Sequence, residues 1–170
     1  MNRTATVRES PAHDLATIGW REWATLPQLG INRIKVKVDT GARTSALHAF
    51  DLEYVEAPAG TMVRFKIHPL QRETSLTVAA IAPLLEMRHI RNSGGQAQER
   101  PVIKTQISLG EQPWDIELTL TNRDVMGFRM LLGREAVRRR FLVDPGGSYL
   151  MSQFSRKATP ADEIDEPDLP

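Results

Sequence analysis

The sequence predicts an all-β protein, a single closed β-barrel with one short helix near its C-terminal end. Apolar and polar residues alternate in several segments, most clearly where Ile116, Leu118 and Leu120 are separated by charged and polar residues. An alternation of period two is typical of a strand with one buried face. Short strands at regular spacing, with turn residues between them, favour a closed or folded barrel.

The elements can be placed in order along the chain. Strands are expected at 18–23, 33–38, 52–55, 62–67, 75–80, 86–91, 102–109 and 114–120. An apolar segment at 130–132 predicts a further short strand, which leads into a helix at about 134–140, and a final strand at 141–143 ends in an Asp-Pro-Gly-Gly turn. Residues 92–99 contain Gly94 and Gly95 and predict a long hairpin tip.

Length and composition bound the class of protein. The 170 residues suffice for one well-buried domain, expected at 16–154, with a flexible arm at 1–15 and a disordered acidic tail at 155–170. The chain has no cysteine, which excludes disulfides and thiolate metal sites. Neither a secretory signal nor a stretch long enough to span a bilayer is visible, so we expect a cytoplasmic protein without membrane contact.

Charge gives little support for nucleic-acid binding. The net charge is +1, because the acidic tail at 155–170 offsets a charge of +4 on the rest of the chain. That is a weak electrostatic footprint, and no nucleic-acid motif accompanies it. We therefore expect no direct contact with nucleic acid.

The most informative motif is Asp39-Thr40-Gly41, which follows an alternating strand. A carboxylate on a tight turn behind a buried strand is held rigidly, as a catalytic aspartate must be. The same tripeptide is also a good ordinary turn, because Asp accepts local backbone hydrogen bonds and Gly readily adopts positive φ. A second motif, Leu131-Leu132-Gly133-Arg134, places a short apolar strand before the predicted helix.

These two motifs, in this order, resemble those of retropepsins, the single-domain aspartic peptidases of retroviral type. The chain is more similar still to the bacterial RimB-like group, long labelled ATP-dependent zinc proteases. The similarity covers most of 18–150 and is carried by residues 18–22, 39–48, 91–95, 99–102 and 131–134. It implies a barrel of retropepsin type, an aspartic endopeptidase with Asp39, Thr40 and Gly41 in the catalytic motif, and a flap formed by the hairpin at 92–99.

The sequence carries one Asp-Thr-Gly, whereas aspartic peptidases use two carboxylates that share a proton. Asp124 and Asp144 stand in turn contexts but lack the following Thr-Gly. The chain is therefore half of a site, and an active homodimer would bring two Asp39 side chains together across a two-fold axis.

Arg43 departs from the viral pattern, in which an acidic residue at this position pairs with the Arg of the later Gly-Arg. Arg134 must then find another partner, such as Glu135 or a backbone carbonyl. Arginine recognises carboxylates well, so an acidic, glutamate-rich peptide is the expected substrate. The residues expected to bind it are Ala42, Arg43, Arg91, Ser93, Gly94, Gly95, Arg100 and Arg134. The RimB-like group is linked with RimK-type ATP-grasp ligases, which add glutamate residues to a small-subunit ribosomal protein, so the resemblance implies such a ligase as a possible partner.

Two other functions stay open. One is a non-catalytic module of the same fold that binds a glutamate ligase or its ribosomal substrate. The other is a zinc peptidase, for which His48, His68 and His89 would have to converge in space, since the four histidines show no i, i+4 pair. The sequence predicts no metal site and no cofactor. Ser45 and His48 lie close together without a nucleophile elbow, and Ser45 is expected to bond to local backbone groups.

Overall fold

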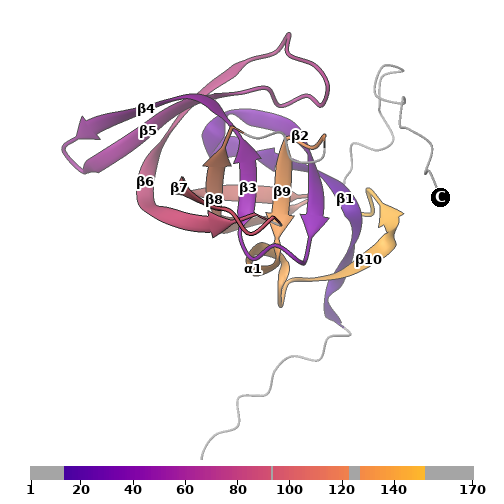
Figure 1. Ribbon diagram of the computed structural model, residues 1–170. Helices are drawn as coiled ribbons and strands as arrows, with labels where there is room; N and C mark the ends of the chain where they lie inside the picture. The colour runs from indigo at the N-terminus through magenta and orange to yellow at the C-terminus, as the bar shows by residue number, and fades with distance from the viewer. Residues whose placement is uncertain (1–13, 93, 123–126, 152–170) are drawn as a thin grey trace, which may run out of the picture.

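The structure is a computed structural model that describes residues 14–92, 94–122 and 127–151. The described strands are β1 (Ala16–Leu26), β2 (Ile31–Asp39), β3 (Ser45–His48), β4 (Phe50–Ala57), β5 (Gly60–Ile67), β6 (Val78–Arg91), β7 (Ala97–Leu109), β8 (Gln112–Thr121), β9 (Met130–Gly133) and β10 (Phe141–Ser148). A 3-10 turn, η2 (Pro27–Leu29), follows β1, and the α-helix α1 (Arg134–Val137) follows β9 (Figure 1).

Six strands close the barrel in the order β1, β2, β9, β3, β8 and β7. The barrel closes where Ser108 of β7 lies opposite Thr25 of β1. The pairs β2–β9 and β3–β8 are parallel and the other four are antiparallel. The prediction of an all-β closed barrel with one short helix is confirmed.

The barrel interior is filled by apolar side chains that alternate along the strands. In β8, Trp114, Ile116 and Leu118 are buried, and Asp115 and Glu117 between them are exposed. This alternation agrees with the sequence prediction for the segment. The indole Nε1 of Trp114 donates to the carbonyl of Ala136 at 3.1 Å and so fixes α1 against the barrel. Full burial of one large aliphatic side chain contributes about 1.5–3 kcal/mol. The large side chains that are buried almost completely include Ile18, Leu26, Ile31, Ile34, Leu47, Phe65, Ile67, Ile103, Ile107, Leu109, Leu118 and Leu120.

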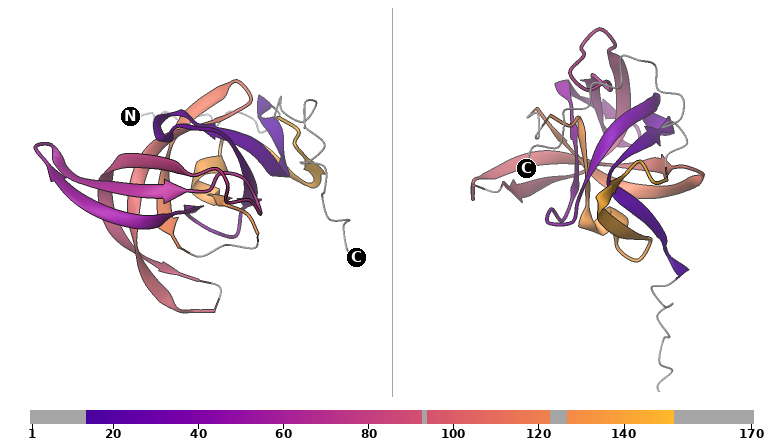
Figure 2. Two further views of the ribbon diagram at one scale, coloured as in Figure 1. Left: turned by 90° about the horizontal axis from the view of Figure 1, so that it is seen from above. Right: turned by 90° about the vertical axis from the view of Figure 1, so that its right-hand side faces the viewer.

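Strands outside the barrel extend it on two sides. β10 runs parallel to β1, and β6, β5 and β4 continue the sheet beyond β7. The β4–β5 hairpin projects from the body of the molecule (Figures 1 and 2). The β6–β7 hairpin projects as well, on another side (Figure 2, left).

The segment after β10 is fastened by a buried carboxylate. The side chain of Glu22 is fully buried and accepts hydrogen bonds from the backbone N–H groups of Gly19, Leu150 and Met151 at 2.8–3.3 Å. Hydrogen bonds of this kind offset the cost of burying a polar side chain. Glu22 therefore links β1 to the end of the described chain.

Some element boundaries differ from the sequence prediction. The expected strands 75–80 and 86–91 form one long strand, β6, which pairs with β5 up to Pro83 and with β7 from Leu84. A register shift between Leu84 and Glu86 marks the change of partner and interrupts the alternation. β3 was not predicted, because it has only four residues and its first three are all buried.

At the C-terminal side, α1 is shorter and β10 is longer than expected. The helix ends at Val137, since Arg138 has an extended ψ of 138°. β10 continues through the expected turn at 144–147 to Ser148, because it pairs with β1 across that segment. The acidic tail at 155–170 lies outside the described residues, as does the arm at 1–15 except for its last two residues. Within the described part of the chain, no helix has the length and apolarity needed to cross a membrane.

Candidate active site

The two sequence motifs meet at the barrel wall. β2 ends at Asp39 and lies parallel to β9, with Asp39 directly opposite Gly133. Figure 1 shows β2, β9 and β3 side by side, with α1 below them. The strand pairing therefore brings Asp-Thr-Gly and Leu-Leu-Gly-Arg, some ninety residues apart, into one site.

The turn after β2 fixes the Asp39 carboxylate. Its Oδ1 accepts hydrogen bonds from the N–H of Gly41 at 3.0 Å and the N–H of Ala42 at 3.2 Å. The Ala42 N–H also approaches the carbonyl oxygen of Asp39 at 3.2 Å. Asp39 thus makes the local bonds of an ordinary turn, and these same bonds orient a half-buried carboxylate.

Backbone hydrogen bonds connect the loop after Asp39 to the start of α1. The N–H of Arg134 donates to the carbonyl of Ala42 at 2.7 Å, and the N–H of Glu135 donates to the carbonyl of Arg43 at 3.1 Å. The Arg134 guanidinium donates to the carbonyl of Thr40 at 3.2 Å. The prediction that Arg134 finds a backbone carbonyl is confirmed, whereas Glu135 pairs with Arg138.

Ser45 makes a non-local contact, so the prediction of local bonding was wrong. Its buried Oγ accepts a hydrogen bond from the N–H of Gly133 at 3.0 Å, and its carbonyl accepts one from the Thr119 hydroxyl at 2.9 Å. The physical reason is the antiparallel pairing of β3 with β9, which brings Ser45 beside Gly133. Ser45 therefore helps to hold the strand that faces Asp39.

A cleft of about 890 Å³ opens beside this loop. Its lining includes the loop from Gly41 to Ser45 and the end of β6 from Arg88 to Arg91. Residues 115–117 of β8 and Glu135 and Ala136 of α1 complete the lining. Three of the predicted substrate-binding residues, Ala42, Arg43 and Arg91, line it.

The cleft carries charges of both signs. Arg88 pairs with Glu86 and, at 2.8 Å, with Glu117. These pairs, that with Glu117 foremost, raise the pKa of Arg88 above its usual value. Arg43 and Arg91 add positive charge, and Asp115 and Glu135 add negative charge. The cleft is therefore less uniformly basic than the arginines of the sequence suggested.

Comparison with known proteins identifies the family. The sequence model for "RimB-like: Retropepsin-like aspartic endopeptidase RimB" matches residues 17–153. The chain belongs to this family. A crystal structure of a protein of unknown function from Legionella pneumophila superposes with a TM-score of 0.68 and 26% identity over 81% of this chain and 98% of that one. This RimB-like chain thus shares its fold with a solved structure.

Longer relatives carry a similar domain. A probable alpha-L-glutamate ligase of Parasynechococcus marenigrum is 50% identical over 137 residues, which are 81% of this chain and 29% of the ligase. A probable alpha-L-glutamate ligase of Desulfotalea psychrophila is 43% identical over 141 residues, 83% of this chain and 30% of the ligase. The chain therefore spans less than a third of the length of these relatives, in which a RimB-like domain is fused to the rest of a glutamate ligase.

The hairpin that the sequence predicted as a flap is present between β6 and β7, and its role as a flap stays a prediction. At its tip the N–H of Gly95 donates to the carbonyl of Asn92, and the Asn92 side chain accepts from the N–H of Gln96, both at 3.0 Å. Gly95 has φ of 80°, a value that favours glycine. Gly94 is exposed at this tip, and Ser93 lies outside the described residues.

Two of the arginines predicted to bind the substrate do not line the cleft. Arg100 is only 8% exposed and its Nε donates to Gln98, while Arg134 is bonded to the loop carbonyl described above. Neither is among the residues that line the cleft, nor are the flap glycines. Their contact with a bound peptide stays a prediction.

The histidines considered for a zinc site lie on separate elements. His48 ends β3, His68 follows β5 and contacts the carbonyl of Leu76, and His89 lies in β6. Over residues 14–92, 94–122 and 127–151, no three His, Cys, Asp or Glu side chains come together as a set that could hold a metal ion.

Proposed function

We propose that this domain is an aspartic endopeptidase that hydrolyses peptide bonds in acidic, glutamate-rich protein tails and is active as a homodimer. The observation that carries the proposal is the placement of Asp39 against Gly133, on a turn that orients one carboxylate. Membership of the RimB-like family supports the reaction class. Discrimination between acidic and neutral peptides by the purified protein tests it.

The chemistry requires a second carboxylate close to the first. Two such groups cannot both ionise, so one stays protonated. The ionised carboxylate takes a proton from water, the water oxygen attacks the peptide carbonyl, and the protonated partner donates to the carbonyl oxygen. As the C–N bond of the resulting diol breaks, the carboxyl that took the proton from water gives it to the leaving nitrogen, and the diol returns a proton to the other carboxylate. Thr40 would support the pair by a hydrogen bond across the two-fold axis, and the backbone of Gly41 would contact the substrate.

The single Asp-Thr-Gly supports a homodimer in which each protomer gives one carboxylate. Addition of a ninefold excess of inactive Asp39→Asn protein is therefore expected to lower wild-type activity to about a tenth after subunit exchange, because random pairing leaves about one wild-type protomer in ten with a wild-type partner. Initial rates measured after a long co-incubation check this. Activity that is unchanged despite demonstrated exchange would refute the shared site.

The preference for acidic substrates is supported by Arg43 and Arg91 at the cleft and by the glutamate-ligase relatives. Replacement of Arg43 by alanine is expected to lower kcat/KM for glutamate-rich peptides about tenfold and to leave neutral peptides nearly unaffected, since a charge-assisted hydrogen bond contributes about 1.5–3 kcal/mol. The loss should shrink as salt screens the attraction. Steady-state kinetics over a salt series measure both effects.

Arg64 provides a matched control for Arg43. It is an arginine on β5, it pairs with Glu53 at 3.0 Å, and it does not line the cleft. Arg64→Ala makes the same change in net charge and is expected to leave both peptides unaffected. Equal losses in the two variants, or equal losses on acidic and neutral peptides, would contradict recognition by Arg43.

A second candidate function is a non-catalytic module that binds a RimK-type glutamate ligase or its ribosomal protein substrate. The fusion of similar domains to probable alpha-L-glutamate ligases favours it. An effect of the purified domain on the length of the glutamate chains that a ligase adds, retained by Asp39→Asn in the absence of any hydrolysis, would support this function over the enzyme.

A further inference from the structure

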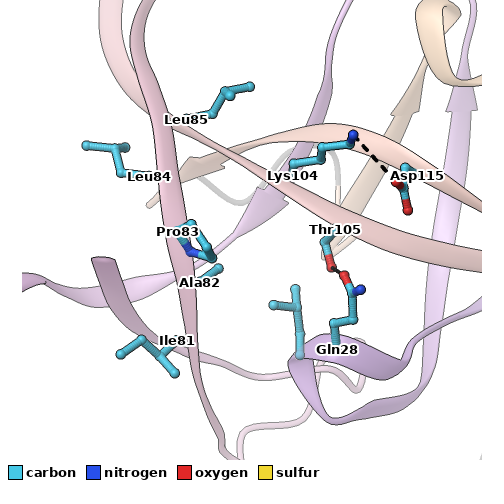
Figure 3. A pocket seen from close by; sticks show the side chains of 10 residues that line it. Gln28, Ile81, Ala82, Pro83, Leu84, Leu85, Lys104, Thr105 and Asp115 are labelled. Atoms are coloured by element: carbon cyan, nitrogen blue, oxygen red, sulfur yellow. Dashed lines mark hydrogen bonds and ion pairs between the residues drawn. The ribbon is translucent and has the colours of Figure 1, made fainter. Parts of the chain in front are cut away.

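A second cavity lies outside the candidate active site, where strands β6 and β7 separate. It measures about 490 Å³, and Figure 3 shows the side chains around it. One wall is the β6 segment from Ile81 to Leu85, and the other is formed by Gln28 and Leu29 of η2 with Lys104 and Thr105 of β7. Asp115 completes the lining. We call this cavity the β6–β7 groove.

The groove exists because β6 changes its pairing partner. β6 pairs with β7 from Leu84 onwards, opposite Ile103, while its earlier residues pair with β5 on the other edge. Among the described strands, none pairs with the edge of β6 that faces the groove before Leu84. Proline at position 83 lacks an N–H and suits such an edge.

On the opposite wall, a side chain occupies the place of a strand partner. The Oε1 of Gln28 accepts the backbone N–H of Gln106 at 2.9 Å and the Thr105 hydroxyl at 3.4 Å. One backbone N–H group at the edge of β7 therefore already has a hydrogen-bond acceptor. The edge of β6 is the one available to an added strand, the mode of binding in which an extended peptide extends a sheet.

The β6 wall is apolar and exposed. Ile81 is 47% and Leu85 is 49% exposed, and Pro83 between them is exposed too. Leu85 stands at the register shift of β6. The ion pair of Lys104 and Asp115, 3.5 Å apart, lies across the groove from the apolar wall (Figure 3).

The groove and the candidate active-site cleft share a lining residue and a strand. Asp115 lines both cavities, and β6 runs through both, with Ile81–Leu85 in the groove and Arg88–Arg91 in the cleft. From position 83 to position 90 an extended strand spans about 23 Å. A polypeptide of about seven extended residues would therefore reach from one cavity to the other.

We propose that the β6–β7 groove is an exosite that binds an extended apolar segment of the protein substrate, about seven residues along the chain from the part of the substrate that lies in the cleft. The inference rests on the proposed function, since it assigns the occupant of the cleft as the same polypeptide. It implies that the domain recognises an acidic tail together with an apolar segment of the protein that bears it.

Peptide binding to the Asp39→Asn protein tests the exosite without turnover. Two peptides share one glutamate-rich segment and carry an extension of equal length. In one peptide the extension is rich in Leu and Val, and in the other it is rich in Ser and Gly. Each pair is made once with the extension at the N-terminal end and once with it at the C-terminal end. At one of the two ends, the peptide with the apolar extension is expected to have a Kd about tenfold lower than the peptide with the polar extension, as measured by fluorescence anisotropy. Burial of one aliphatic side chain is sufficient for this gain in affinity. Leu85→Asp or Ile81→Asp, added to Asp39→Asn, should remove that gain.

Leu76 gives the matched control, since it is 47% exposed and lies outside the groove lining. Leu76→Asp should keep the gain, and circular dichroism verifies that each variant is folded. Equal Kd values for the two extensions, or equal losses in the Leu76 and Leu85 variants, would overturn the exosite. If wild-type protein cleaves neither peptide while Leu85-dependent binding persists, the proposed peptidase function fails and the groove stands as a peptide-binding site.

Discussion

Replacement of Asp39 by asparagine is expected to abolish peptide hydrolysis and to leave the fold intact. Removal of one member of a catalytic unit commonly lowers turnover by about four powers of ten or more. In the proposed homodimer the change would remove both carboxylates, so neither the base nor the acid of the dyad would remain. The fold should survive because the asparagine Oδ1 can still accept the N–H groups of Gly41 and Ala42. Initial rates on an acidic peptide and thermal unfolding measure the two effects.

Asp144 offers a matched control for this substitution. Its Oδ1 accepts the N–H of Gly146, two residues on, at 2.9 Å, the same local bond that Asp39 makes with Gly41 at 3.0 Å. Asp144→Asn should therefore retain wild-type rates. A chelator should also leave the wild type active, whereas loss of activity on chelation and its recovery with zinc would favour the zinc mechanism. Undiminished hydrolysis by Asp39→Asn would exclude an aspartic mechanism at this residue.

Periodicity predicted the barrel well where strands are long and half-buried. β8 shows this, because Ile116 and Leu118 face the core and Glu117 faces solvent. Periodicity fails where both faces are covered or where a strand changes partner. β3 has no exposed residue among its first three, and β6 shifts its register at Leu84, so local patterns there carry no clear period. Closure of the barrel by the pairing of Thr25 with Ser108 depends on tertiary structure, and no local sequence pattern predicts it.

The candidate site was predictable to the extent that it resides in local motifs. Asp39 and Gly133 were singled out as motif residues, and strand pairing places them opposite each other. The sequence predicted that Arg134 would bond to a backbone carbonyl or to Glu135, because Arg43 stands where viral retropepsins have the acidic partner of this arginine. The observed partner is a carbonyl. Ser45 could not be assigned, since its contact with Gly133 spans 88 residues and depends on β3, a strand that was not predicted. Only knowledge of the β3–β9 pairing would have revealed it.

Replacement of Gly133 by alanine is expected to destabilise the domain and to lower its activity at the same time. An added Cβ would lie 2.6 Å from the carbonyl carbon of Thr44 and 2.8 Å from the backbone N of Ser45. Backbone atoms cannot rotate away as a flexible side chain can, so β9 or the loop must move. The conformation of Gly133 itself, φ −79° and ψ 169°, suits alanine. The cost is therefore steric rather than conformational.

Overpacking of this kind costs about 1–3 kcal/mol and occasionally more, against about 0.4–1 kcal/mol gained by restricting the unfolded chain. With backbone on the contacted side, we expect a net loss near the upper end, about 3 kcal/mol, and a Tm lower by about 6–12 °C. Because Asp39 is the register partner of Gly133, the same shift displaces the carboxylate, and a misplacement of about 1 Å costs about 100-fold in rate.

Thermal unfolding and kcat should be measured together, with Gly146→Ala as the control. A Cβ on Gly146 meets nothing closer than 3.5 Å, so that variant should change the free energy of unfolding by less than about 0.5 kcal/mol. A Gly133→Ala protein that keeps both its Tm and its kcat would show that β9 and the loop after Asp39 do not approach this closely in solution. A lower Tm with unchanged kcat would show that the packing of Gly133 does not control the position of Asp39. The pairing of β2 with β9 would then stabilise the fold without contributing to catalysis.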